Sequence, residues 1–255
     1  MRRLAPLAIC SLLLSAACSQ GHIDDGGATV TVLAAASLTE SFQAIGHDFE
    51  QQHPGEVSVR FGFGPSDGLA QQIQQGAPAD VFASASEKWM DAVADDPGVS
   101  HRADFARNRL TIVVPASDPA GIERVDDLAK PGVKLVLAAE GVPAGDYARQ
   151  MLDNAGIADA ALANVVSNEI DVKGVLQKVA AGEADAGIVY VTDVTPDVRT
   201  QVRAVAIPDD VNVIAQNPIA VVDGSDVPGL AATFVRYVEG PGQDVLRSAG
   251  FLPAR

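Results

Sequence analysis

Short apolar runs alternate with amphipathic stretches along most of this chain. From residue 29 onward the apolar runs have the length of buried strands, and the stretches between them carry apolar residues at helical spacing. The runs that predict strands are 29–34, 57–63, 80–83, 110–114, 134–138, 165–167 and 186–191. The stretches that predict helices are 38–52, 69–75, 87–94, 146–155, 172–181, 229–239 and 242–248. This alternation is typical of the α/β class, in which helices cover both faces of mostly parallel sheets.

Polar residues or glycines follow several of the predicted strands. Ser37 follows the run 29–34, Ser66 follows 57–63, and the segment Val142-Pro143-Ala144-Gly145 follows 134–138. Open α/β sheets bind ligands beyond the carboxyl ends of their strands, where the next helix directs its unpaired N–H groups. Several such ends converging in one cleft would bind an anion without any Lys or Arg side chain.

The length of 255 residues allows two lobes around such a cleft. The chain could cross between lobes near 107–109 and again near 213–218. We therefore predict that residues 29–107 and 217–255 form lobe 1 and that residues 108–216 form lobe 2.

The N-terminal segment reads as a targeting sequence. Residues 1–17 combine a short basic start with an apolar run, 4–14, that is too short to span a bilayer, and they predict a signal peptide. Small residues directly before Cys18 resemble a bacterial lipobox, which predicts acylation of Cys18 and a flexible tether over 18–28. Ordinary cleavage, giving a free periplasmic or secreted protein, is the alternative. The other cysteine, Cys10, lies in the apolar run, so we expect no disulfide in the body of the protein.

Composition and motifs argue against several classes of function. A net charge of -15 with no basic cluster argues against binding to nucleic acid or to anionic membranes, so a lipid anchor would be the only membrane contact. The sequence contains no H-E-x-x-H, EF-hand, P-loop or G-x-G-x-x-G motif. We expect neither a cofactor nor a resident metal.

Some of these residues also fit ordinary structural roles. Ser37 and Glu40 fit a capping box, and Asp171 fits a helix N-cap. Tyr190 ends a predicted strand, where a phenol is commonly a packing residue, and 142–145 could be a plain loop before a helix at Asp146.

Ser66 also allows an enzymatic interpretation. It lies in Gly64-Pro65-Ser66-Asp67-Gly68, which matches the G-x-S-x-G motif of serine hydrolases. A serine nucleophile needs a base, and only His101 follows Ser66, much sooner than that fold requires. A secreted serine hydrolase using Ser66 is therefore the weaker alternative to a binding protein.

Taken together, the segments resemble the molybdate-binding protein family of bacterial ABC importers, which has the two-lobed type II periplasmic-binding-protein fold. The similarity runs from about Thr29 to Phe251, and its strongest stretches are 34–39, 76–85, 142–148, 171–174, 187–190 and 250–251. The resemblance implies that five residues bind a molybdate or tungstate oxyanion: Ser37 and Ser66 through hydroxyls, Ala144 and Val172 through backbone N–H groups, and Tyr190 through its phenol. It also implies a monomer, not an enzyme, that delivers its ligand to an ABC permease with a cytoplasmic ATPase.

One position departs from the pattern of that family. Asp67 stands beside Ser66, where small residues and serines are usual. A carboxylate in the site could accept a proton from hydrogen phosphate, whereas a site made only of donors favours a fully ionised dianion. We expect Asp67 to face solvent or to cap the following helix. A receptor for sulfate, phosphate or another small anion is the alternative to a molybdate receptor.

Overall fold

The computed structural model describes residues 27–255, so the predicted signal peptide, Cys18 and most of the tether lie outside the described residues. The strands are β1 (Ala28–Ala35), β2 (Val57–Gly64), β3 (Val81–Ala83), β4 (Val99–Pro115), β5 (Leu135–Ala138), β6 (Val165–Glu169), β7 (Ala186–Tyr190), β8 (Val202–Ala206) and β9 (Ile214–Val222). The α-helices are α1 (Thr39–Gln52), α2 (Ser66–Gln74), α3 (Glu87–Asp95), α4 (Pro143–Asn154), α5 (Ala158–Leu162), α6 (Val172–Ala180), α7 (Pro228–Glu239) and α8 (Gln243–Ala249). Short 3-10 helices are η1 (Ala36–Leu38), η2 (Val125–Ala129) and η3 (Val191–Asp193).

The strands follow the order β2-β1-β3-β9-β4-β7-β5-β6, and β8 pairs with β4. The predicted parallel pairing is confirmed in two groups, β1 with β2 and β3, and β5 with β6 and β7. Every antiparallel pairing among the described strands involves β4 or β9, and these were not predicted. The chain thus contains two α/β halves joined by two long antiparallel strands.

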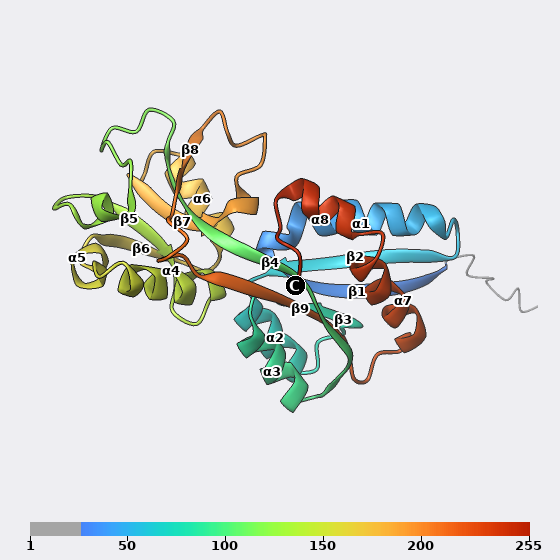
Figure 1. The fold of residues 1–255 in the computed structure, drawn as a ribbon. Coiled ribbons are helices and arrows are strands. Elements are labelled where there is room, and N and C mark those ends of the chain that lie inside the picture. The colour runs from blue at the N-terminus through green and yellow to red at the C-terminus, as the bar shows by residue number, and fades with distance from the viewer. Residues whose placement is uncertain (1–26) are drawn as a thin grey trace, which may run out of the picture.

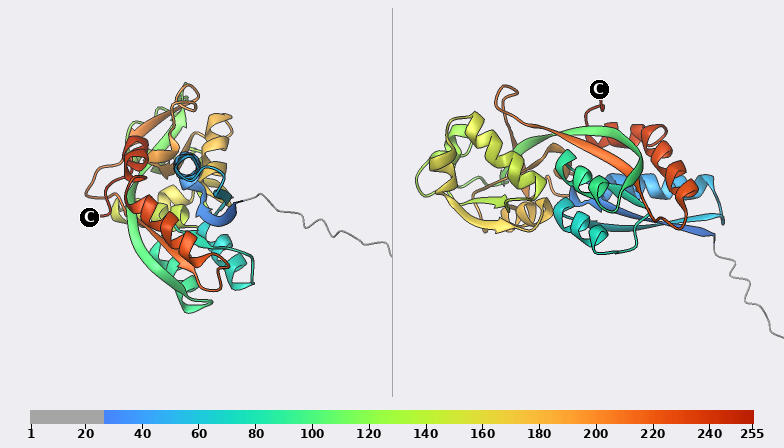
Figure 2. Two further views of the ribbon diagram at one scale, coloured as in Figure 1. Left: turned by 90° about the vertical axis from the view of Figure 1, so that its right-hand side faces the viewer. Right: turned by 90° about the horizontal axis from the view of Figure 1, so that it is seen from below.

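Figure 1 shows the two halves side by side. One half contains β1–β3 with α1, α2, α3, α7 and α8, and the other contains β5–β8 with α4, α5 and α6, while β4 and β9 extend along both. The same division is visible from below in Figure 2. The lobe boundaries predicted at 107/108 and 216/217 fall inside β4 and β9.

Strand β4 is much longer than the predicted run 110–114, since it begins at Val99. Its ladder with β9 shifts register between Ser100 and Ala103 and again between Asp104 and Ala106. Each shift interrupts the alternation of inward and outward side chains, which removes the period-2 signal from the sequence. Strand β9 was missed for a related reason, because Pro218 lies inside it and a proline argues against a central strand.

Two helices begin a full three residues earlier than predicted, and both changes affect the cleft. Helix α2 begins at Ser66, not at residue 69, because Pro65 adopts the extended conformation of an N-cap. Helix α4 begins at Pro143, not at Asp146, since proline suits the first helical position. The interpretation of 142–145 as a plain loop was wrong, and Ala144 lies in the first turn of α4.

The main apolar core extends through both halves and includes Phe42, Phe105, Ile112, Leu137 and Ile188. A smaller cluster lies under α2 and α3 and holds them against the first half; its members include Ile73, Phe82, Met90 and Val93. Each helix that reaches the cleft is therefore fixed by its own apolar face.

Candidate functional site

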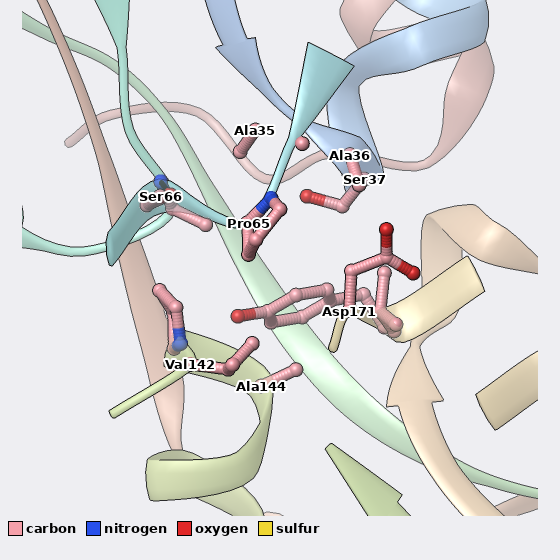
Figure 3. Close-up of a pocket in the computed structure, with 13 residues that line it drawn as sticks. Ala35, Ala36, Ser37, Pro65, Ser66, Val142, Ala144 and Asp171 are labelled. Carbon is pink, nitrogen blue, oxygen red and sulfur yellow. Dashed lines mark hydrogen bonds between the residues drawn. The ribbon is translucent and has the colours of Figure 1, made fainter. Parts of the chain in front are cut away.

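A pocket between the two halves brings together residues from six separate parts of the chain (Figure 3). Its lining consists of the residues that follow strand ends or begin helices, namely Ala35, Ala36, Ser37, Gly64, Pro65, Ser66, Ala85, Val142, Pro143, Ala144, Asp171, Val172 and Tyr190. All five residues predicted to bind an oxyanion are in this set. In Figure 3, Ser37 and Asp171 lie on one side of the pocket, and Ser66 and Val142 lie on the other.

Three helix N-termini contribute backbone to the pocket. Ser66 is the first residue of α2, Ala144 the second of α4 and Val172 the first of α6. The first N–H groups of an α-helix have no partner within the helix, and the helix dipole makes this end favourable for negative charge. The pocket therefore combines N–H groups from both halves.

The hydroxyl groups are equally suited to donation. The Ser37 Oγ and the Tyr190 phenol oxygen are buried, and neither has a hydrogen-bond partner within residues 27–255. Ser66 Oγ accepts a hydrogen bond from the Ala85 N–H at 3.0 Å, which leaves its own proton for another acceptor. Because an unpartnered buried polar group costs about 1–3 kcal/mol, two of them in one small pocket indicate a ligand that accepts hydrogen bonds.

The capping-box interpretation of Ser37 was wrong. Ser37 lies within η1, and Leu38 is the N-cap of α1, with no capping hydrogen bond from its side chain. Instead, both carboxylate oxygens of Glu40 accept hydrogen bonds from the Nζ of Lys173 in the other half. The Ser37 hydroxyl is thus left free for the pocket.

Burial and nearby acidic groups keep the Tyr190 phenol protonated, so that it can donate a hydrogen bond. Burial raises the pKa of Tyr190 well above that of an ordinary phenol, and the nearby Tyr147 and Asp193 raise it further, so the group remains protonated. No Lys or Arg is among the thirteen lining residues. The one lining carboxylate, Asp171, accepts the Gly174 N–H at 2.9 Å, which confirms its predicted N-cap role.

A serine hydrolase needs a base beside Ser66, and the pocket lining contains no histidine. Among residues 27–255, no group of three or more His, Cys, Asp or Glu side chains is placed to hold a metal ion. The arrangement is built to bind an acceptor through neutral donors.

Comparison with known proteins is consistent with that chemistry. The family of bacterial extracellular solute-binding proteins matches residues 30–252. The chain belongs to this family.

Relatives of this solute-binding protein share most of its length. The molybdate-binding protein ModA of Mycobacterium tuberculosis is 40% identical over 239 residues, covering 93% of this chain and 89% of that protein. The molybdate-binding protein ModA of Escherichia coli is 34% identical over 247 residues, covering 93% and 94%. The structure of the periplasmic molybdate-binding protein of Azotobacter vinelandii matches with a TM-score of 0.77 at 20% identity, covering 89% of this chain and all of that one. This last similarity confirms the predicted fold class.

Membership of an extracellular family places the solute-binding protein outside the cytoplasm. None of the helices in residues 27–255 combines the length and the apolar composition needed to cross a bilayer.

The size of the pocket limits the solute. The cavity between the lining residues has a volume of about 20 Å³, whereas sites for drug-sized ligands measure about 300–1,000 Å³. A small ion fits this space better than an extended organic molecule.

Asp67 does not cap α2, because no side-chain hydrogen bond caps this helix, and the residue is half-buried. Its Oδ1 is buried without a hydrogen-bond partner in the described residues. It is also absent from the pocket lining. Asp67 directly follows the lining residue Ser66 in α2, so its carboxylate lies beside the site but outside the pocket wall.

The hydrogen bond between Asp193 and the backbone of Tyr190 was not predicted from the sequence. Asp193 is fully buried, and its Oδ2 accepts the Tyr190 N–H at 2.9 Å. The Nζ of Lys173 lies 3.6 Å from Asp193 Oδ1 and 2.8 Å from both carboxylate oxygens of Glu40, which belongs to the other half. Lys173 follows Val172 directly, but nothing in the sequence links it to a carboxylate twenty residues later.

Proposed function

We propose that this solute-binding protein captures molybdate, and tungstate with it, and delivers the ion to an ABC permease that works with a cytoplasmic ATPase. The observation that carries the proposal is the pair of buried, unpartnered hydroxyls of Ser37 and Tyr190 in a small pocket with three helix N-termini. Ser37 and Ser66 would bind the ion through their hydroxyls, Ala144 and Val172 through backbone N–H groups, and Tyr190 through its phenol.

The donor set favours a dianion. A neutral hydroxyl or N–H group can donate to every oxygen of molybdate, whereas hydrogen phosphate also needs an acceptor for its own proton. Neutral donors also suit a transport receptor, since release breaks no charge pair. Size would distinguish molybdate and tungstate from the smaller sulfate, and the names of the relatives support molybdate as the cargo.

The remaining features of the proposal concern the whole protein. Acylation of Cys18 would anchor it to the outer face of the membrane through the tether 18–28, as the lipobox-like sequence indicates. It would act as a monomer without a cofactor, and hinge motion would close the two halves on the ion.

Titration calorimetry with molybdate, tungstate, sulfate and phosphate tests the proposal. We expect heat of binding with molybdate and tungstate, weaker binding of sulfate, and little or none of phosphate. A preference for phosphate that weakens in Asp67→Asn would overturn the assignment. Ester hydrolysis that is lost in Ser66→Ala would favour the hydrolase alternative.

Removing either serine hydroxyl should weaken the affinity for molybdate. Ser37→Ala and Ser66→Ala each delete one hydrogen bond to a charged ligand, so we expect a loss of roughly 1–3 kcal/mol in binding free energy by calorimetry. The matched control is Ser86→Ala, since Ser86 also carries a buried, unpartnered hydroxyl but does not line the pocket. Equal affinities in all three variants would place the anion elsewhere.

Tyr190→Phe should weaken molybdate binding without lowering the stability of the ligand-free protein. Because the phenol oxygen is buried without a partner, its removal should leave the melting temperature of the ligand-free protein unchanged or higher. Molybdate binding should weaken by about 1–2 kcal/mol, since one donor is lost. Tyr237→Phe is the control, because that phenol accepts a bond from Gln52 far from the pocket. A lower melting temperature with full affinity would assign Tyr190 to packing alone.

A further inference from the structure

A tryptophan on α3 forms a hydrogen bond across the cleft. The Nε1–H of Trp89 donates to the carbonyl oxygen of Gly141 at 2.8 Å. Next to it, the Nζ of Lys88 lies 3.4 Å from Asp146 Oδ2 and 4.9 Å from the centre of the Trp89 ring. Helix α3 belongs to the first half, whereas Gly141 and Asp146 lie on either side of the start of α4 in the second half.

The segment that receives this bond is one rigid unit with the pocket wall. Asp146 Oδ1 accepts the Gly141 N–H at 2.7 Å, and Gly141 has a φ of 88°, which few residues other than glycine adopt. Between these two residues lie Val142, Pro143 and Ala144, which line the pocket. A displacement of the Gly141 carbonyl therefore also moves the Ala144 N–H.

The donor is equally well fixed to its own half. Met90 and Val93 anchor α3 in the smaller apolar cluster, and the half-buried Trp89 packs at the edge of that cluster. Arg102 on β4 bonds Asp91 and Glu87 on the same helix. The indole thus moves with the first half when the two halves separate.

We propose that the Trp89–Gly141 hydrogen bond is a closure clasp that positions the Ala144 N–H against the bound oxyanion, with Lys88 and Asp146 in support. The inference rests on the proposed function, because it names the residues that stabilise the closed, ion-bound form. A bond that joins the two halves exists only when they are closed, so it raises affinity by stabilising that form alone. Trp89 carries most of the effect, since the Lys88–Asp146 pair is largely exposed.

Trp89→Phe tests the clasp, because phenylalanine retains an aromatic ring in the apolar cluster and lacks the N–H donor. We expect molybdate to bind about tenfold more weakly by calorimetry, the upper part of the range for one hydrogen bond. The melting temperature of the ligand-free protein should stay close to that of the wild type. The control is Asp91→Asn, which replaces the ion pair between Asp91 and Arg102 by a neutral contact within the first half and should leave affinity unchanged.

The possible results separate the clasp from the proposed function. If the wild type binds molybdate and Trp89→Phe binds it equally well, the clasp is wrong and the proposed function stands. A lower melting temperature with unchanged affinity gives Trp89 a packing role only and also overturns the clasp. If the wild type binds none of the four oxyanions, the proposed function fails and the clasp fails with it.

Fluorescence gives a second readout, because Trp89 is the single tryptophan of the chain. In the closed form the indole is held against Gly141, so molybdate should reduce quenching of its emission by acrylamide. The same reduction should occur in Asp91→Asn. Identical quenching of the wild type with and without saturating molybdate contradicts the clasp.

Discussion

Gly145→Ala should abolish measurable molybdate binding and lower the free energy of unfolding by about 3 kcal/mol, the upper part of the usual range for overpacking. A Cβ at this position would lie 2.1 Å from the carbonyl oxygen of Ala139 and 2.4 Å from that of Ala138. Both are backbone atoms at the end of β5, so no side-chain rotation can relieve the overlap. The first turn of α4 would have to move away from β5, and the Ala144 N–H would move with it.

This expectation is opposite to that from helix propensity. Gly145 has an ordinary helical conformation, and alanine in such a position is normally more stable than glycine by about 1 kcal/mol. Gly229→Ala is the matched control, since Gly229 lies in the first turn of α7 and a Cβ there meets nothing within 4 Å. Urea denaturation should show a loss of stability for Gly145→Ala and an unchanged or higher stability for Gly229→Ala. Similar effects of the two changes would contradict the steric argument.

The contrast between these glycines shows what local sequence can and cannot specify. The α/β alternation followed from apolar periodicity. A proline occupies the first position of both helices, Pro143 in α4 and Pro228 in α7, although the start of α4 was predicted only at Asp146. How closely a helix start approaches a strand end depends on the packing of the whole layer. The close approach of Gly145 to the end of β5 is visible only in the structure.

The candidate site was predictable to the extent that it depends on strand ends. Ser37, Ser66 and Ala144 each follow a predicted strand, and parallel strands bring their carboxyl ends to one edge of a sheet. The same rule predicted a cleft between two lobes, whereas the assignment of Val172 and Tyr190 to the binding set came from the family resemblance. Whether a hydroxyl caps its helix or remains free could not be read from sequence, because the capping box of Ser37 depends on where the helix begins.

Contacts between distant residues were the least predictable part of the site. Trp89 and Gly141 are separated by 52 residues and Lys173 and Glu40 by 133, and neither pair shares a motif. Each contact exists because the antiparallel strands β4 and β9 hold the two halves together, and those strands were largely missed. Residues that close the cleft therefore became visible only in the structure.

Asp193 should make the solute-binding protein less stable as the pH rises from 4 to 7. Burial raises the pKa of this carboxyl to about 6 from its ordinary value of 3.8, although Lys173 and the Tyr190 N–H act in the opposite direction. Between pH 3.8 and about pH 6, the two pKa values of this carboxyl, the folded state binds a proton that the unfolded state has lost. The free energy of unfolding therefore falls through this window, by up to about 3 kcal/mol.

Asp193→Asn should remove this contribution, because an amide does not titrate but can still accept the Tyr190 N–H through its oxygen. Urea denaturation at pH 4, 5, 6 and 7 measures the difference between variant and wild type, which should shift in favour of the variant as the pH rises. Taking the difference cancels the repulsion among the many other carboxylates of this acidic chain.

Asp127→Asn provides a control of opposite sign. The Glu123 N–H and the Lys130 ammonium lower the pKa of Asp127, so its ionised form stabilises the folded state above about pH 4, near the ordinary pKa of aspartate. That variant should be least stable relative to the wild type at pH 6 and 7 and should approach it in acid. If both variants shift in the same direction with pH, burial does not dominate the titration of Asp193, and its carboxylate is instead stabilised by Lys173.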